Sequence, residues 1–164
     1  MSYSTYILCQ AEEPVSRQKI ADFIRDGVYF EDEPRYDPSP PTGNLGRLSI
    51  CFDPRRAPII VERLESDEAA GAIEEALDAT GRARLPEYRG EEARQRVVQE
   101  IRQHIQLTRD VIRFEFDRDA LTEDAWVMLD SIENEIIKEG DGILYAYEDG
   151  FYGASLKVMA RIRK

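Results

Sequence analysis

The chain has 164 residues, of which 42 % are hydrophobic and 34 % charged, and its formal net charge is −11 at pH 7. These values describe one ordinary globular domain that can bury enough surface to fold without a disulfide or a metal. The negative charge opposes binding to nucleic acid and to anionic membranes, which attract clustered lysine and arginine, so we expect neither as a partner. In many cytosolic proteins, a negative charge of this size only keeps the protein soluble.

The N-terminal segment and the cysteines indicate a cytoplasmic protein. The first residues, MSYSTYILCQAEE, have no basic region and an apolar run of only four residues, so they do not resemble a signal peptide. No stretch approaches the roughly 20 apolar residues of a membrane helix. Cys9 and Cys51 both fall in expected strands, and we expect them to be reduced and buried.

The chain opens with a predicted strand and a predicted helix. Residues 4–10 are rich in β-forming side chains and predict the strand. Ser16 is placed to cap the helix, and Val15 can contact Ile20 across its first turn as a hydrophobic staple. Gly27 is expected to end this helix.

A loop and two strands follow. Residues 31–46 contain four prolines and two glycines, a composition that excludes a helix or a central strand. A surface loop of this length in a compact domain is usually functional or disordered. Alternating apolar residues predict a strand over 47–53, and an apolar opening predicts another over 58–65.

The middle of the chain predicts two helices. Ser66 is expected to cap the first helix, which ends at Gly81, and acidic residues follow the cap where they complement the helix dipole. The second helix runs from residue 91 to about residue 108 and is polar over most of its surface.

The last third repeats the order of the first: a strand, a helix and two more strands. Residues 111–117 alternate cleanly between apolar and charged side chains and predict a half-buried strand. Thr122 is the expected helix cap, with Leu121 stapled to Trp126. Two further strands are expected over 143–147 and 156–162, with a hairpin turn at Asp149-Gly150.

These elements predict an α+β fold: an antiparallel or mixed sheet of about six strands with helices packed on one face. We expect residues 1–164 to form a single domain. Because residues 4–65 and 111–162 share one order of elements, they could be a pseudo-duplication of two ferredoxin-like βαββ halves, joined by the two middle helices. Sequence identity between the halves is essentially absent, so the duplication is an open hypothesis.

Candidate catalytic and metal-binding groups are few. The chain has one histidine and two cysteines and lacks a nucleophile elbow, a P-loop or a dinucleotide-binding glycine pattern, so we expect no cofactor. His104 lies near the apolar stripe of its helix, which favours a structural histidine over a general base. Glu115, Asp117 and Asp119 could form a row for Mg²⁺ or Ca²⁺ on one strand face. The solvent-exposed face of an antiparallel sheet shows the same row of charged residues at every second position.

An aromatic hairpin is the strongest candidate for a binding surface. Its rings belong to Tyr145, Tyr147, Phe151 and Tyr152. A two-residue turn at Asp149-Gly150 would place Tyr147 opposite Tyr152. Cross-strand aromatic pairs also stabilise sheets, so the rings could be core; tyrosine is nevertheless favoured at binding surfaces. Tyr36, in the proline-rich loop, could join the same surface.

The leading hypothesis is therefore a non-catalytic, acidic, cytosolic protein that binds a protein partner through the aromatic hairpin and the proline-rich loop. The alternative is an enzyme that acts on a small molecule or depends on a divalent metal, with Glu115, Asp117 and His104 as its polar groups. A third hypothesis is a nucleic-acid mimic, which requires acidic side chains in a row over one exposed face.

Overall fold

The structure is a computed structural model that describes residues 1–87 and 89–162. Its strands are β1 (Ser2–Cys9), β2 (Arg35–Asp37), β3 (Arg47–Cys51), β4 (Ile59–Arg63), β5 (Ala83–Arg84), β6 (Asp110–Asp117), β7 (Gly142–Ala146), β8 (Gly150–Tyr152) and β9 (Val158–Ile162). Its helices are α1 (Arg17–Gly27), α2 (Ser66–Thr80), α3 (Glu91–Gln106) and α4 (Glu123–Gly140), with 3₁₀ turns η1 (Arg118–Ala120) and η2 (Ala154–Leu156).

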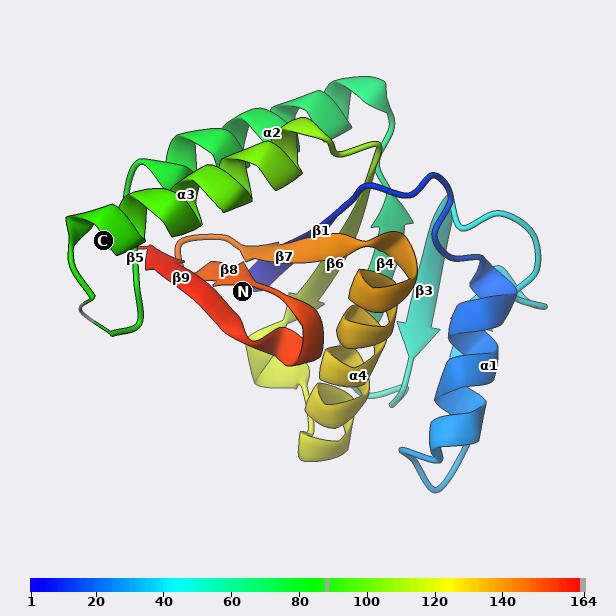
Figure 1. Ribbon diagram of the computed structural model, residues 1–164. Coiled ribbons are helices and arrows are strands. Elements are labelled where there is room, and N and C mark those ends of the chain that lie inside the picture. The colour runs from blue at the N-terminus through cyan, green and yellow to red at the C-terminus, as the bar shows by residue number, and fades with distance from the viewer. Residues whose placement is uncertain (88, 163–164) are drawn as a thin grey trace.

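In the described residues, nine strands form one sheet in the order β2-β3-β4-β6-β1-β7-β8-β9-β5, and neighbouring strands are antiparallel (Figure 1). The α+β class is confirmed, but the expected number of about six strands was too low. Strands β2, β5 and β8 have three, two and three residues. Segments this short are below the length at which apolar alternation reveals a strand.

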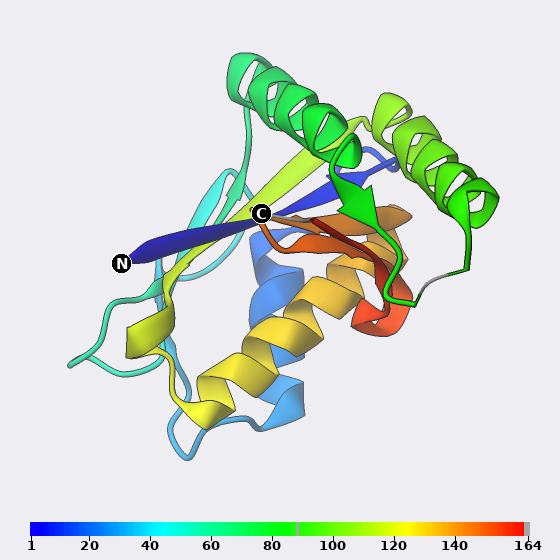
Figure 2. The same cartoon turned by 90° about the vertical axis from the view of Figure 1, so that its left-hand side faces the viewer.

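Helices cover both faces of the sheet, so the expectation that they lie on one face was wrong. Helices α1 and α4 lie on one side of the strands, and α2 and α3 lie on the other (Figure 1, Figure 2). Within β1, Ile7 belongs to the core beneath α1 and α4, whereas its neighbour Leu8 belongs to the core beneath α2 and α3. Successive side chains of a strand point to opposite faces. A strand in which both are fully buried must therefore be covered on both sides.

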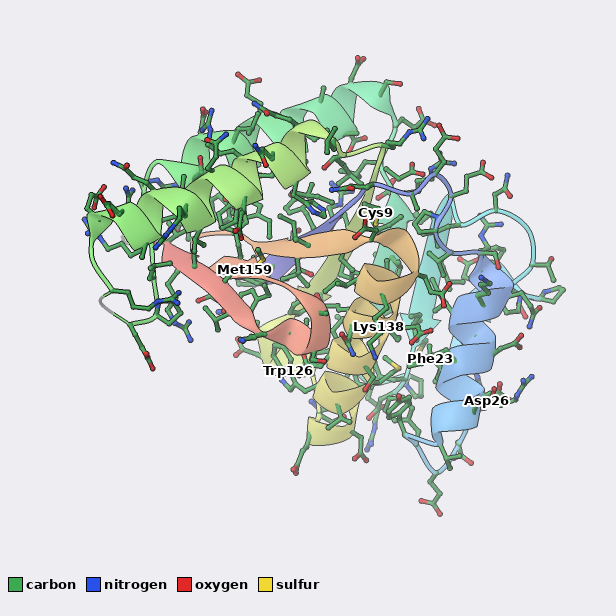
Figure 3. The ribbon with its side chains drawn as sticks, viewed as in Figure 1. Cys9, Phe23, Asp26, Trp126, Lys138 and Met159 are labelled. Atoms are coloured by element: carbon green, nitrogen blue, oxygen red, sulfur yellow. The ribbon has the colours of Figure 1, made fainter. Side chains whose placement is uncertain are left out.

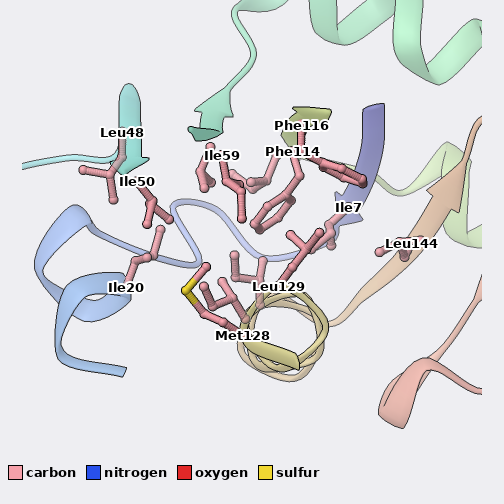
Figure 4. Close-up of a cluster of buried hydrophobic side chains, with 14 of the residues drawn as sticks. Ile7, Ile20, Leu48, Ile50, Ile59, Phe114, Phe116, Met128, Leu129 and Leu144 are labelled. Atoms are coloured by element: carbon pink, nitrogen blue, oxygen red, sulfur yellow. The ribbon is translucent and has the colours of Figure 1, made fainter. Parts of the chain in front are cut away.

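The core beneath α1 and α4 is built on the alternation of β6. Phe114 and Phe116 point from the sheet toward α4, where Met128 and Leu129 meet them (Figure 4). All four side chains are at most 4 % exposed. The predicted half-buried strand over 111–117 is confirmed, because Ile112, Phe114 and Phe116 share this face and the charged residues that alternate with them are only partly buried.

The core beneath α2 and α3 combines small helix residues with large sheet residues. Ala72, Ala76 and Ala79 of α2 are at most 7 % exposed, and their short side chains allow a helix to approach a sheet closely. Tyr145 of β7 and Phe151 of β8 belong to the same cluster, and their stacked ring centroids are 5.1 Å apart. The two rings therefore fill the space that the alanines leave.

The two halves of the chain share their first steps and then differ. A helix on the same face follows the first strand of each half: α1 follows β1, and α4 follows β6. In the first half the chain passes from the outer strand β2 inward to β4, which pairs with β6. In the second half it starts at β7, beside β1, and moves outward through β8 and β9. The strand order is reversed, and the pseudo-duplication into ferredoxin-like halves stays a prediction.

The cysteines lie on different faces and are both free thiols. Cys9 belongs to the core beneath α1 and α4, and burial raises the pKa of its thiol to about 12. Cys51 is half-buried and follows Ile50, whose side chain is in that same core, so Cys51 points to the opposite face.

Two predicted helix caps form, and one does not. The side chains of Ser16 and Thr122 each accept a backbone N–H hydrogen bond of 3.2 Å at the start of α1 and α4. The prediction for Ser66 was wrong, because Ser66 is the first residue of α2 and the capping position belongs to Glu65, which makes no side-chain cap bond. Within the described chain, no helix has the length and apolar character needed to cross a membrane.

Replacing Thr122 by alanine should lower the free energy of unfolding by about 1 kcal/mol, because an N–H group at the start of α4 loses its acceptor. The measurement is urea denaturation followed by circular dichroism. Thr122→Ser keeps the hydroxyl and should retain most of the stability. Equal loss in the two variants would show that the methyl group, and not the cap, stabilises this end of α4.

Candidate functional site

A cleft lies on the α4 side of the sheet, next to the hairpin that joins β7 and β8. Its walls come from β1, the end of β6, one side of α4, strands β7 and β8, and η2, and its volume is about 450 Å³. Small-molecule pockets have volumes of roughly 300–1,000 Å³. We name it the acid–aromatic cleft, after the carboxyl groups of Asp130, Glu133 and Asp149 and the rings of Tyr3, Trp126 and Tyr152 that line it.

One stripe of α4 forms the helical wall of the acid–aromatic cleft. Trp126, Asp130 and Glu133 follow one another at spacings of four and three residues, so they project from the same side of the helix. Figure 3 shows Trp126 on the α4 side of the sheet, away from α2 and α3. The same helix uses Leu129 and Ile132 to cover the core. The packing of this neighbouring side of α4 on the core holds the wall in place.

Glu133 is the buried carboxyl of the cleft, with 4 % of its surface exposed. Thr5 on β1 donates a hydrogen bond of 2.7 Å from its hydroxyl to Oε2. The nearby charged group is Asp130, another carboxylate. Burial raises the pKa of Glu133 to about 8, Asp130 adds to the rise, and the Thr5 hydrogen bond opposes it. At neutral pH the carboxyl is therefore mostly protonated.

Aromatic rings line the cleft on the side of β1 and β6. Phe116 makes edge-to-face contacts with Tyr3 and with Trp126, at centroid distances of 5.7 and 5.6 Å. The guanidinium of Arg118 lies over the Tyr3 ring, 3.5 Å from its centroid. Tyr3 also donates a hydrogen bond of 3.0 Å to the carbonyl of Tyr147, which fixes the ring against the hairpin. These contacts hold the rings in place without a ligand.

Polar contacts hold the outer rim of the cleft. The Tyr152 hydroxyl donates a hydrogen bond of 2.6 Å to Asp149, and burial raises the pKa of that hydroxyl to about 12. Asp149 also pairs with Arg161 at 3.6 Å. The N–H of Ser155 in η2 donates to Asn134 on α4 at 2.7 Å. The rim is therefore tied both to the sheet and to α4.

The rings of the predicted aromatic hairpin separate into core, surface and cleft. Tyr145 and Phe151 are 1 % and 0 % exposed and pack beneath α2 and α3. Tyr147 is 46 % exposed, at the turn. Tyr152 lines the acid–aromatic cleft on the opposite face. Two of the four rings therefore serve the core, which leaves Tyr147 and Tyr152 accessible to a partner or ligand.

The predicted turn of this hairpin was wrong. Ala146 pairs with Gly150, and Leu144 pairs with Tyr152. The turn consists of residues 147–149, with Glu148 in the left-handed region at a φ of 56°, so Tyr147 is in the turn and does not face Tyr152. Gly150 is needed for the close approach of β9, because a Cβ at this position would lie 2.5 Å from the carbonyl oxygen of Ala160.

Tyr36 is far from the hairpin. It lies on the edge strand β2, five strand positions away from β7, which corresponds to about 24 Å across the sheet. The ring is half-buried, and within the described chain its buried hydroxyl has no hydrogen-bond partner. Burial raises its pKa to about 12. The structure does not bring Tyr36 to the surface formed by Tyr147.

His104 connects α3 to β1. Its Nε2 lies 3.0 Å from the carbonyl oxygen of Leu8, and its Nδ1 lies 3.1 Å from the amide nitrogen of Gln10. A carbonyl accepts and an amide nitrogen donates, so the contacts fit a neutral imidazole protonated on Nε2. Both ring nitrogens are thus engaged in holding the helix to the strand.

The polar groups considered for an enzyme do not converge. Leu8, beside His104, pairs with Val111, whereas Asp117 pairs with Ser2 at the other end of β1. Six residues of strand, about 20 Å, separate the two ends. His104 and Asp117 therefore cannot contact one small substrate together.

Glu115, Asp117 and Asp119 do not lie in one row on a strand face. Asp119 leaves the strand in η1, where its N–H donates to Asp117 at 3.0 Å. Glu115 accepts a hydrogen bond of 3.2 Å from Ser2. Across residues 1–87 and 89–162, no group of three or more histidine, cysteine or acidic side chains is placed to hold a metal ion.

A larger hollow of about 800 Å³ lies at the start of α2. Its buried carboxylate, Asp110, is already paired, because Arg63 Nε lies 2.6 Å away and the N–H of Glu13 also donates to it. The hydrogen bond to Asp110 raises the pKa of Arg63. The buried carboxylate of this hollow thus has a cationic partner, whereas the hydrogen bond to Glu133 in the acid–aromatic cleft comes from the neutral Thr5.

The sequence interpretation identified Tyr152 but missed the other groups of the cleft. A signal for Glu133 is present: it lies four residues after Leu129 and four before Ile137, both of which are core positions. A carboxylate inside the apolar stripe of a helix indicates a buried acid. Tyr3 and Thr5 have no such signal, because the fold brings them to α4 from 128 residues away, as the Thr5–Glu133 separation shows.

Comparison with models of protein families, with curated proteins and with solved structures found no match. The function must therefore be inferred from the side chains of the site.

Proposed function

We propose that the protein is a binding protein and that the acid–aromatic cleft receives its ligand. The observation that carries this proposal is the Glu133 carboxyl, which is 4 % exposed and borders a space of about 450 Å³. A buried carboxyl is costly unless it is paired and hydrogen-bonded. Thr5 bonds to one of its two oxygens. A ligand that bonds to the other oxygen would offset that cost.

Binding fits the lining better than catalysis. Glu133 has a pKa suited to proton transfer. The hydroxyl next to it, however, is that of Thr5, which is only 6 % exposed and therefore poorly accessible to a substrate. That hydroxyl donates to the carboxyl and so positions it. The alternative enzyme built on His104, Glu115 and Asp117 lacks support, because the fold separates these groups.

A ligand screen that reads the cleft directly tests this proposal. Trp126 is the single tryptophan of the chain and lines the cleft, so its fluorescence and its indole N–H signal in NMR report occupancy. The probes are a library of small cations, anions and neutral molecules. We expect some of them to raise the melting temperature, as any ligand of the native state does, and to shift the Trp126 signals.

A matched pair of variants locates the hits. Ala146→Leu adds bulk to the sheet wall of the cleft and should abolish binding, whereas Val127→Leu, at a position that is 51 % exposed on α4, should not. Circular dichroism and melting confirm that both variants fold. The proposal that the cleft is a ligand site is contradicted if no compound of the library binds the wild type and fails to bind Ala146→Leu.

Tyr147 supports a second candidate, a protein partner. The ring is 46 % exposed at the turn beside the cleft, and exposed tyrosine is enriched at interfaces. The net charge of −11 favours a basic partner and opposes nucleic acid. Tyr147→Ala should weaken a partner complex at least tenfold and leave the Trp126 ligand signal unchanged. If this variant binds the partner as tightly as the wild type does, Tyr147 is not part of a partner-binding surface.

We propose that the protein is located in the cytosol. Its support is that Cys9 and Cys51 are free thiols on different faces of the sheet, as is usual in a reducing compartment. Fractionation of the source cells with an antibody against the protein tests the location.

A further inference from the structure

We infer that the acid–aromatic cleft selects a small molecule that carries a primary ammonium group on an aromatic body, and that this ammonium pairs with Glu133. The inference rests on the proposed function, since it names the chemical class of the ligand for the same site. It is drawn from the charges, the rings and the hydrogen-bonding capacity of the cleft.

The charges of the cleft favour a cation. Its lining contains the carboxyls of Asp130, Glu133 and Asp149 and one cationic side chain, Arg118. Asp149 is balanced by Arg161 at 3.6 Å and by the Tyr152 hydroxyl. Asp130 and Glu133 remain, one helical turn apart on α4, and the negative charge of Asp130 raises the pKa of Glu133. Loss of hydration also raises the pKa of Asp130. A bound cation would favour the carboxylate form of Glu133, which burial and Asp130 both oppose.

The rings of the cleft suit the same ligand. A cation is attracted to the face of an aromatic ring, and Arg118 already occupies one such face, 3.5 Å above Tyr3. Phe116 and Trp126 meet edge to face beside it, and Leu144 adds an apolar side chain to the lining. This wall can hold an aromatic body while the charged end reaches α4.

A primary ammonium matches the hydrogen bonds that are still free. It carries three N–H donors and no acceptor. Thr5 already uses Oε2 of Glu133, which leaves Oε1 for the ligand. Because Glu133 is mostly protonated at neutral pH, the ammonium replaces its proton: the O–H bond breaks, the proton goes to solvent, and the carboxylate accepts an N–H bond. Ligand binding and proton release are therefore coupled.

The test is a titration of the full chain with 2-phenylethylammonium, followed by Trp126 fluorescence at pH 6, 7 and 8. The neutral analogue 2-phenylethanol and the anion phenylacetate are the comparison probes. We expect the affinity for the ammonium to rise by up to tenfold for each pH unit, because a smaller fraction of the protein carries the Glu133 proton that must be displaced. The comparison probes should bind at least tenfold more weakly at pH 8.

Variants assign the pH dependence to Glu133, since Asp130, Asp149, Arg118, Tyr3 and Tyr152 also face the cleft. Glu133→Gln keeps the acceptor for Thr5 and should lose both the pH dependence and at least tenfold in affinity at pH 8. Arg118→Gln removes a competing cation and should bind the ammonium severalfold more tightly. Glu139→Gln, an exposed acid on α4, should behave as the wild type.

The outcomes separate this inference from the proposed function. If neutral or anionic probes bind as well as the ammonium and are lost in Ala146→Leu, the cleft is a ligand site but the ammonium assignment is overturned. Unchanged ammonium affinity in Glu133→Gln overturns it too. Tighter binding of a lysine-containing peptide than of the free amine would overturn the small-molecule assignment. If no probe of any charge binds, both proposals fall.

Discussion

Replacing Phe151 by alanine should lower the free energy of unfolding by about 3–5 kcal/mol, the usual cost of removing a buried phenylalanine ring. Phe151 is fully buried beneath α2 and α3 and stacks on Tyr145 at a centroid distance of 5.1 Å. Its removal leaves a cavity that the alanines of α2 are too small to fill. The measurement is urea denaturation at pH 7, with the midpoint and the slope fitted separately.

Tyr147→Ala is the matched control for this result. Tyr147 lies on the same hairpin but is 46 % exposed, and substitutions at exposed positions usually change stability by no more than about 0.5 kcal/mol. The pair therefore separates the core rings of the hairpin from its surface ring. If the two variants lose equal stability, the packing of Phe151 beneath α2 and α3 is not as described.

Replacing Glu133 by glutamine should change how stability depends on pH. Burial raises the pKa of Glu133 from its ordinary 4.5 to about 8 in the folded protein. The folded state therefore holds a proton that the unfolded state has lost, and stability falls as pH rises from about 4.5 to about 8. Since a tenfold change in proton affinity corresponds to about 1.4 kcal/mol, this carboxyl accounts for a loss of at most about 5 kcal/mol.

Glu133→Gln should not show that loss. We expect the variant to be close to the wild type at pH 5 and more stable at pH 9, because glutamine stays neutral and still accepts from Thr5. Urea denaturation from pH 5 to pH 9 measures both profiles, and Glu139→Gln is the exposed control on the same helix. Parallel profiles for wild type and Glu133→Gln would mean that Glu133 ionises in the folded protein as freely as in water.

Local patterns account for what the sequence predicts well. The alternation over 111–117 and the caps at Ser16 and Thr122 depend on neighbours a few residues away, and each forms as expected. The same reasoning fails for β2, β5 and β8, whose two or three residues carry too little pattern. Their pairing depends on the longer strands beside them.

Burial on both faces of the sheet has a signal in the sequence of β1. Three consecutive residues of β1, Ile7, Leu8 and Cys9, are fully buried, and such apolar runs are typical of strands covered on two sides. The site is harder to foresee. Glu133 is detectable as an acid within an apolar stripe, but its partner Thr5 lies 128 residues away. Nothing local to Thr5 indicates that its hydroxyl meets a carboxyl.

The most direct test of the acid–aromatic cleft is the pKa of the Glu133 side chain, measured by carboxyl ¹³C NMR with and without saturating 2-phenylethylammonium. We expect a value near 8 in the free protein, as burial dictates, and a clearly lower value with the ammonium bound, because a paired cation favours the carboxylate. A value near 4.5 in the free protein, or one that the ammonium leaves unchanged, would contradict the assignment of Glu133 as the group that receives the ligand.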